Sequence, residues 1–170
     1  PSNGVNQIFI SKFNSAGTQQ WSKSLGGNYN QFLSYEFGTG LNDNYSNCIY
    51  ISGQVIGDVN FGGINVPGSL NNSDIFLAKM DLSGNYIWVK KGGGGGNDVA
   101  KQFINSYGNI YLSAQTEGPS QFGNFSLPSG GGLIKYDSSG VVLDAKNLYT
   151  ASTMGLINWL HIKFIENELF

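Results

Sequence analysis

Apolar and β-branched residues along this chain gather in short runs that are bounded by glycine, asparagine, aspartate and serine. Representative runs lie at 7–13, 48–52, 74–80 and 109–113. Short runs between turn-forming residues predict β-strands, and strands without polar alternation predict burial on both faces. Only 154–164 is a candidate for a helix, and its aromatic and β-branched residues argue against one. The pattern therefore predicts an all-β chain.

Three turns between these runs share one form. They lie at 14–17, 81–84 and 137–140, and each begins with Asn or Asp and ends with Gly. An Asx side chain accepts hydrogen bonds from the backbone just after it, and glycine adopts positive φ without steric cost. We therefore expect each turn to close a β-hairpin, with its glycine in the left-handed conformation.

The same motifs recur along the chain. A lysine precedes each of these turns, at Lys12, Lys79 and Lys135. Tyr50 and Tyr111, together with the Phe-Gly pairs and prolines that follow them, repeat with one shared spacing. Fixed spacing of this kind indicates a repeat protein with repeat units 1–66, 67–127 and 128–170. The third unit is truncated, so we expect a piece of a longer chain, with varying loops at 26–47 and 68–73.

The second repeat is similar to a known family. It reads D-I-F-L-A-K-M-D-L-S-G-N-Y-I-W-V-K-K-G-G-G over 74–94 and G-N-I-Y-L-S-A over 108–114. These residues resemble the bacterial β-propeller repeat called SBBP, roughly D-x-F-V-A-K-x-D-x-x-G-x-x-x-W-x-x-x-x-G-G followed by G-N-x-Y-V-T-G. The first repeat departs from this pattern at Asn14 and in the longer segment 26–47. The third has Asp144 in place of Trp and lacks the glycine pair, so we expect its second strand to be irregular.

Repeat length and resemblance lead to one fold expectation. Units of this size with four short strands are typical of propeller blades. We expect residues 1–170 to form a partial β-propeller, about two and two-thirds four-stranded blades of a six- to eight-bladed whole. One blade would combine strands near 74–80, 86–91, 100–105 and 109–116. The resemblance also implies a secreted or cell-surface bacterial protein, common in Bacteroidota and often adhesin-like, without catalytic residues that could be transferred.

Composition narrows the possible functions. The net charge is −2, and all nine basic residues are lysine, which argues against a nucleic-acid partner because such proteins carry cationic stripes rich in arginine. A single cysteine, Cys48, excludes an internal disulfide and a cysteine metal cluster. No apolar run is long enough to cross a bilayer as a helix, so no transmembrane segment is predicted.

The repeated lysines and tryptophans allow two interpretations. Lys12, Lys79 and Lys135 could form a cationic ring for anionic glycans, and Trp21 and Trp88 could stack on sugars. Because blade packing recurs in every repeat and a single binding site does not, a structural role is favoured. We expect each lysine to run along a strand towards an edge or a neighbouring aspartate, and each tryptophan to pack between blades.

The other residues that could take part in catalysis or in phosphate or metal binding lack the partners that such sites need. His161 is the only histidine, and a structural role is favoured for it. The five glycines at 92–96 lack the Lys and Ser or Thr of a phosphate-binding loop, so we interpret them as a flexible connection. The segments 57–62 and 81–85 each hold one carboxylate, which favours ordinary turns over calcium sites. Glycosylation sequons begin at Asn44, Asn71 and Asn124, and the dispersed carboxylates are Glu36, Asp43, Glu117, Glu166 and Glu168.

These observations predict no catalytic residue, cofactor or metal. The favoured function is a non-catalytic scaffold or binding module of a larger secreted or cell-surface protein, whose partners are its remaining blades and a carbohydrate or protein. Two alternatives stay open: the propeller part of an extracellular hydrolase or lyase with its site elsewhere, and a purely structural spacer. We expect an open arc to expose apolar surface at both ends and not to fold alone.

Overall fold

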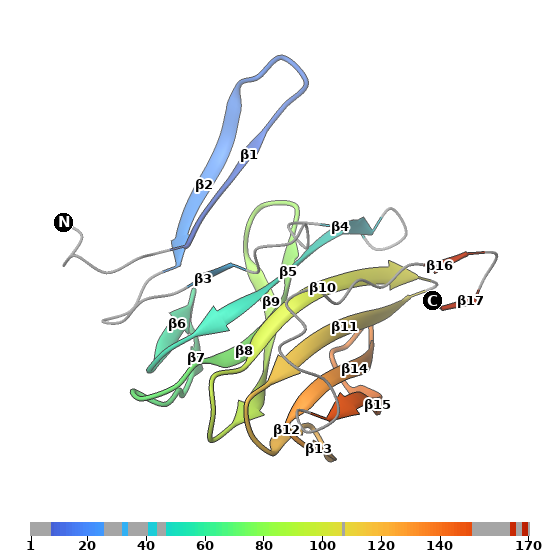
Figure 1. Cartoon of the computed structure of the whole chain (residues 1–170). Coiled ribbons are helices and arrows are strands. Elements are labelled where there is room, and N and C mark those ends of the chain that lie inside the picture. Colours follow the sequence, from blue (N-terminus) through green and yellow to red (C-terminus); the bar gives the residue numbers. More distant parts are fainter. Residues whose placement is uncertain are drawn as a thin grey trace.

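The computed structural model describes residues 8–25, 32–33, 41–43, 47–106, 108–150, 164–165 and 168–169. Within these residues all regular structure is β-strand, which confirms the all-β prediction (Figure 1). Residues 154–163, most of the segment considered as helix, lie outside the described residues. None of the described residues belongs to a helix that is long and apolar enough to cross a membrane.

The strands recur with the spacing of the sequence motifs. The bounds of β5 to β7 recur at one constant offset in β11 to β13, and those of β8 and β9 recur at a second constant offset in β14 and β15. In chain order the strands are β1 (Ile8–Phe13), β2 (Gln19–Leu25), β3 (Phe32–Leu33), β4 (Leu41–Asp43), β5 (Cys48–Val55), β6 (Val59–Phe61), β7 (Ile64–Val66), β8 (Asp74–Asp81), β9 (Tyr86–Gly94), β10 (Val99–Ser106), β11 (Asn109–Thr116), β12 (Ser120–Phe122), β13 (Phe125–Leu127), β14 (Gly130–Asp137), β15 (Val142–Thr150), β16 (Phe164–Ile165) and β17 (Glu168–Leu169).

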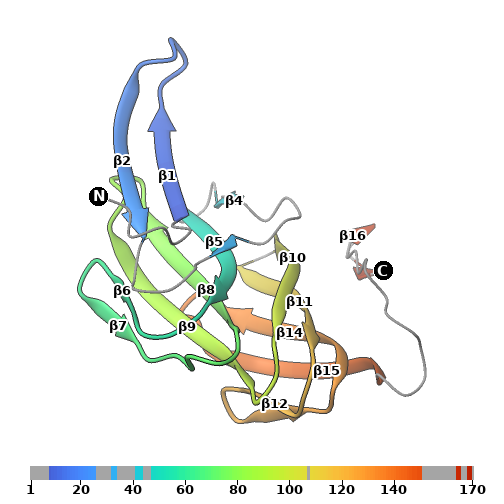
Figure 2. The same ribbon diagram turned by 60° about the vertical axis from the view of Figure 1, so that its left-hand side comes forward.

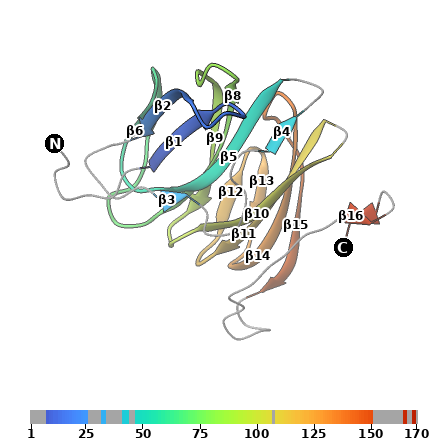
Figure 3. The ribbon, with the colours of Figure 1, turned by 90° about the horizontal axis from the view of Figure 1, so that it is seen from above.

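All pairing between the described strands is antiparallel. The hairpin β1–β2 forms a two-stranded sheet that pairs with no other described strand. The central sheet has the order β13-β12-β9-β8-β5-β3, and β4 also pairs with β5. A four-stranded sheet, here called the outer sheet, has the order β10-β11-β14-β15, and β6–β7 and β16–β17 are separate hairpins. Several sheets are thus joined into one stack, with β1–β2 at one end and the outer sheet at the other (Figures 2 and 3).

The expected grouping of strands was wrong, although the strands themselves form. We expected 74–80 and 86–91 to share a blade with 100–105 and 109–116, but β8 pairs with β5, and β11 pairs with β14. Both pairs run in unbroken register, for example from Cys48 opposite Asp81 to Val55 opposite Asp74. The hydrogen bonds between paired strands satisfy the backbone N–H and C=O groups of both strands. This pairing therefore assigns β8 to the central sheet and β11 to the outer sheet.

The central sheet is not four-stranded as expected, because a hairpin from the next repeat extends it. β12 and β13 lie in the connection between β11 and β14 of the outer sheet, yet β12 pairs with β9 of the central sheet. The pairing joins Ser120 to Gly94 and Gln121 to Gly93. This hairpin therefore ties the two sheets together through the backbone.

The central sheet is buried on both faces, as the apolar runs predict. Its side chains Tyr50 and Leu77 belong to the core shared with Leu112 and Ile134 of the outer sheet. Phe76, Ala78 and Met80 belong to the core on the other face, and the partners there come from β1–β2 and β6–β7: Ile8, Leu25, Val59, Phe61 and Val66. Burial of apolar surface on both faces holds the stack together.

The first repeat departs from this pattern. Phe9 and Phe13 of β1 are 64 % and 56 % exposed, whereas Phe76 and Met80, which occupy the same positions in the second repeat, are fully buried. The prediction of two buried faces for 7–13 is therefore wrong, because no described element covers the outer face of β1–β2. In the third repeat, β15 has an extra irregularity opposite Gly131 and Gly132, as expected.

Candidate functional site

The three Asx turns have the predicted geometry. In the second repeat, Oδ1 of Asp81 accepts hydrogen bonds from the backbone N–H groups of Ser83 (2.8 Å) and Asn85 (2.9 Å). Gly84 has φ = 84°, in the left-handed region. Hydrogen bonds from Asn85, with others in the turn, lower the pKa of Asp81 below its ordinary value. The turns at 14–17 and 137–140 have the same hydrogen bonds.

The carbonyl after each Asx residue accepts two side-chain hydrogen bonds from the hairpin before it. Lys12 Nζ and Trp21 Nε1 both donate to the carbonyl oxygen of Leu82, each at 2.9 Å. We call this arrangement, in which a Lys–Trp pair binds the turn carbonyl of the next hairpin, the junction clamp. It joins β1–β2 to β8–β9, two hairpins that lie far apart in the sequence.

The same clamp joins the second hairpin to the third. Lys79 Nζ and Trp88 Nε1 donate to the carbonyl oxygen of Ser138 at 3.1 Å and 3.2 Å. Leu82 and Ser138 each follow the Asx residue of their turn, so the two clamps are equivalent. The structural interpretation is confirmed for these two lysines and both tryptophans, although the lysine partner is a backbone carbonyl and not an aspartate.

The indole of each clamp also lies against the turn glycine of the next hairpin. A Cβ added to Gly84 would lie 3.1 Å from the Trp21 ring, and one added to Gly140 would lie 3.1 Å from the Trp88 ring. Gly17, in the first turn, has φ = 77° but nothing within 4 Å of such a Cβ. Gly17 thus has the conformation of the other two turn glycines without their packing.

The third lysine has only part of this environment. Lys79 lies over the Tyr50 ring, and Lys135 lies in the same way over the Tyr111 ring, each 5.5 Å from the centroid. Lys135 pairs in register with Asp144, the residue at the tryptophan position. Among the described residues, no turn carbonyl accepts a hydrogen bond from Lys135.

Two buried carboxylates form a second cluster, which the sequence analysis missed. Asp98 is fully buried and accepts hydrogen bonds from Gly94 N (2.7 Å), Ser120 Oγ (3.2 Å) and Glu117 N (3.3 Å). Burial raises the pKa of Asp98 to about 6. The neighbouring Asp74 forms an ion pair with Lys91 at 2.8 Å. The hydrogen bonds of Asp98 connect the end of β9 to the segment that leads into β12. Asp98 therefore has a structural role.

The interpretation of 92–96 as a flexible connection was wrong for most of its length. Gly92 to Gly94 belong to β9. A Cβ on Gly92 would collide with the Phe122 ring, and one on Gly93 would collide with Oδ1 of Asp74. Only Gly95 has open space around it. The glycine run is therefore required by close packing of backbone and side chains.

The remaining candidates are dispersed. In the described part of the chain, no three His, Cys, Asp or Glu side chains come together as they would at a metal ion. Asp58 Oδ1 accepts a hydrogen bond from Gly68 N at 3.0 Å, and Asp81 is held by its own turn. The segment 81–85 forms an ordinary turn as expected, whereas 57–62 contains strand β6 and is not a turn throughout. Glu117 Oε2 accepts from Asn97 N at 3.0 Å. His161, Glu36, Glu166, Asn44 and nearly all of 26–47 lie outside the described residues, and the side chains of Asp43 and Glu168 are not described.

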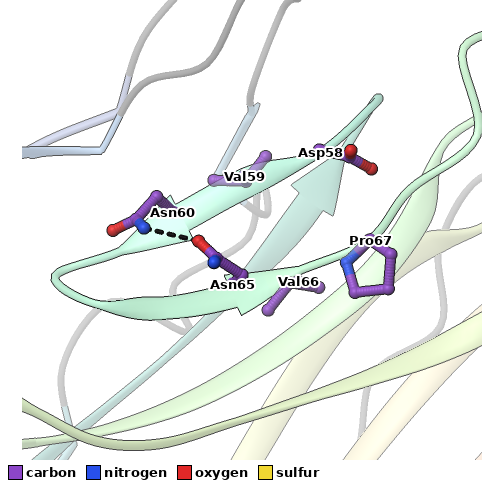
Figure 4. Close-up of a pocket in the computed structure, with 6 residues that line it drawn as sticks. All are labelled: Asp58, Val59, Asn60, Asn65, Val66 and Pro67. Atoms are coloured by element: carbon purple, nitrogen blue, oxygen red, sulfur yellow. Dashed lines mark hydrogen bonds between the residues drawn. The ribbon is translucent and has the colours of Figure 1, made fainter.

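The hollows in the surface include two that are lined by described residues. One of about 350 Å³ lies on the β6–β7 hairpin and is lined by Asp58, Val59, Asn60, Asn65, Val66 and Pro67 (Figure 4). Asn60 Nδ2 donates to Asn65 Oδ1 across the hairpin, and Gly63 N donates to Asn60 Oδ1. The other, of about 250 Å³, is lined by Lys90, Lys91, Gly123, Asn124, Tyr136, Gly140, Val141 and Val142.

The sequence matches no protein-family model, and no curated protein matches it significantly. The geometry itself indicates what the described residues do. Lys12, Lys79, Trp21 and Trp88 are occupied in holding hairpins together, and Asp98 is enclosed by backbone and Ser120. The β6–β7 hollow presents the exposed polar side chains of Asp58, Asn60 and Asn65.

Proposed function

We propose that this chain is a non-catalytic scaffold, an arc of a β-propeller of the SBBP type within a larger secreted or cell-surface bacterial protein. The observation that carries this proposal is the junction clamp, which recurs with the same residue types at both junctions between successive hairpins. An interaction repeated at every junction serves the architecture, because one binding or catalytic site would not need it in each repeat.

The order of the layers supports a blade-like arrangement. Each hairpin of the repeat packs its lysine face on the apolar face of the next hairpin, first β1–β2 on β8–β9 and then β8–β9 on β14–β15. In propellers, four-stranded sheets stack in this way around an axis, and each blade contacts only its neighbours. The outer sheet consists of four antiparallel strands, which is the number in a propeller blade.

As a binding module, the scaffold would present the β6–β7 hollow. Its polar lining consists of the Asp58 carboxylate and the Asn60 and Asn65 amides, and hydrogen bonds from Gly57 N to Ser69 O and from Gly68 N to Asp58 hold the adjoining loop 68–73 beside it. Amides and carboxylates pair with hydroxyl groups, so a carbohydrate is the ligand class that fits this lining best. A protein loop is the second class.

Binding to an array of bacterial surface glycans tests this function. Residues 1–170 should be retained, and Asn65→Ala should abolish retention by removing the amide. The matched control is Gln121→Ala on the equivalent hairpin β12–β13, where Ser126 Oγ donates to Gln121 Oε1 at 2.6 Å. Retention that both variants keep would exclude the hollow as the site. If neither glycans nor cell surfaces retained the chain, only the structural-spacer function would remain.

A further inference from the structure

The two ends of the described stack carry complementary halves of the junction clamp. At one end, the turn 14–17 offers the carbonyl of Ser15, which occupies the position of Leu82 and Ser138 in the two completed clamps. At the other end, Lys135 occupies the position of Lys12 and Lys79. β1–β2 and the outer sheet lie on opposite sides of the central sheet, so the halves cannot meet within one molecule (Figure 3).

We call the end with the Ser15 carbonyl the acceptor half, and the end with Lys135 the donor half. The acceptor half has an apolar surface of the kind that a neighbouring layer would bury. Phe9 and Phe13 are exposed over more than half of their area on the outer face of β1–β2. Their counterparts Phe76 and Met80 are fully buried in the core that β1–β2 and β6–β7 complete. Gly17 leaves open the space in which an aromatic ring lies at both completed junctions. Apolar surface that is exposed in only one of several equivalent repeats indicates a missing neighbour.

The donor half has the lysine and its aromatic support. Lys135 lies over the Tyr111 ring just as Lys79 lies over Tyr50, so its ammonium group is positioned in the same way. Leu133 occupies the repeat position of Leu77, which belongs to the core at the second junction. Asp144 replaces the tryptophan, so this half supplies one hydrogen-bond donor where the completed clamps supply two.

We propose that this chain associates head to tail with a second copy of itself. The outer face of β1–β2 in one copy packs on the outer face of the outer sheet in the other, and Lys135 Nζ donates to the carbonyl oxygen of Ser15. A contact between two different surfaces leaves one half free at each end, so it propagates or closes into a ring. Further blades of a longer chain would occupy the same two faces, so the inference concerns residues 1–170 alone. It rests on the clamp contacts and does not depend on carbohydrate or protein binding by the scaffold.

A complementation experiment by sedimentation velocity tests this association. Lys135→Glu disables the donor half, and the double variant Phe9→Ser/Phe13→Ser disables the acceptor half. The unmodified chain should associate increasingly with concentration, and each variant alone should associate at least about tenfold more weakly. The equimolar mixture should form a one-to-one complex and nothing larger, because one intact half remains on each partner.

A matched control is Ile87→Ser, which removes a side chain that is 53 % exposed on β9 and belongs to neither half. It should associate like the unmodified chain, and far-UV circular dichroism should show that all variants keep the same strand content. An unmodified chain that stays monomeric at high concentration would overturn the proposal. So would variants that associate as strongly as the unmodified chain, or a mixture that forms no complex.

Discussion

The Trp21 ring lies against Gly84 across the first junction, so closely that a Cβ on the glycine would be 3.1 Å from three atoms of the indole. The same indole donates its N–H to the carbonyl of Leu82, which lies in the same turn as that glycine. At the second junction, a Cβ on Gly140 would likewise lie 3.1 Å from the Trp88 ring, and the Lys90 side chain would lie nearer, at 2.7 Å. Trp88 donates its N–H to the carbonyl of Ser138 in that turn. Glycine is therefore required at each of these two turn positions for two reasons: the backbone is left-handed, and a Cβ would crowd the aromatic ring.

Gly84→Ala should lower the free energy of unfolding for both reasons, and comparison with a control glycine separates the two contributions. The substitution forces a Cβ into the left-handed conformation, at about 1 to 2 kcal/mol, and crowds the indole, at about 1 to 3 kcal/mol more. The matched control is Gly17→Ala, where φ is 77° and the space is open, so only the backbone cost applies. Urea denaturation measures both. Equal losses of stability would show that the indole does not lie on Gly84.

Lys79→Met should lower the free energy of unfolding by about 1 kcal/mol, because the hydrogen bond to Ser138 O is lost while Trp88 still donates to that oxygen. Lys135→Met should cost about half as much, because Lys135 lies over the Tyr111 ring but donates to no turn carbonyl in the described part of the chain. The double variant Lys79→Met/Trp88→Phe leaves the carbonyl without either donor, and its loss should exceed the sum of the single losses. Additive losses would mean that the two donors do not share an acceptor.

Phe76→Ala and Phe9→Ala should differ sharply, although both residues occupy the same position in the repeat. Phe76 is fully buried in contact with Phe61, whose ring centroid lies 5.1 Å away, so its truncation should cost about 3 to 5 kcal/mol. Phe9 is largely exposed, and in dilute solution its truncation should change stability by less than about 0.5 kcal/mol. Thermal and urea unfolding of the monomer test this pair. Similar losses would show that the face of β1 is covered in the monomer.

Asp98 should make stability fall as pH rises from about 4 to about 6. Its pKa in the folded chain is about 6, against an ordinary value of 3.8, so within this window the folded state holds a proton that the unfolded chain has released. The free energy of unfolding should decrease by about 2 to 3 kcal/mol across the window and level off above it. Asp98→Asn should remove this decrease, as seen by the difference between the two urea-unfolding profiles.

Asp81→Asn is the control for that pH profile. The pKa of Asp81 is lowered by the hydrogen bonds of its turn, so its carboxylate stabilises the folded chain above the ordinary pKa, and that contribution is lost as the pH falls further. This variant should differ from the unmodified chain in the acid limb below about pH 4, with the opposite sign. Parallel profiles for Asp98→Asn and the unmodified chain between about pH 4 and 6 would contradict the role assigned to Asp98.

Local features of the fold were predictable from the sequence. Apolar runs indicated the positions of β1, β5, β8 and β11, and Asx-x-x-Gly spacing indicated the three turns, because both depend on neighbours along the chain. The recurrence of Lys and Trp at one repeat position indicated contacts between repeats, which Trp21 and Trp88 make.

The partners of these elements were not predictable in the same way. The strands of successive repeats have nearly the same pattern, so the sequence does not distinguish pairing of β8 with β5 from other groupings. The acceptors of the clamps are backbone carbonyls of Leu82 and Ser138, which leave no side-chain signal. The burial of Asp98 and the close packing of Gly92 depend on β12, which approaches from the outer sheet.

Hydrogen exchange of the indole N–H groups of Trp21 and Trp88, followed by NMR and assigned with Trp→Phe variants, tests the junction clamp most directly. Both protons should exchange far more slowly than in free tryptophan. Gly84→Ala should accelerate exchange at Trp21 alone, and Gly140→Ala at Trp88 alone. Exchange of both protons at the rate of free tryptophan in the folded chain would show that the hairpins are not joined in this way.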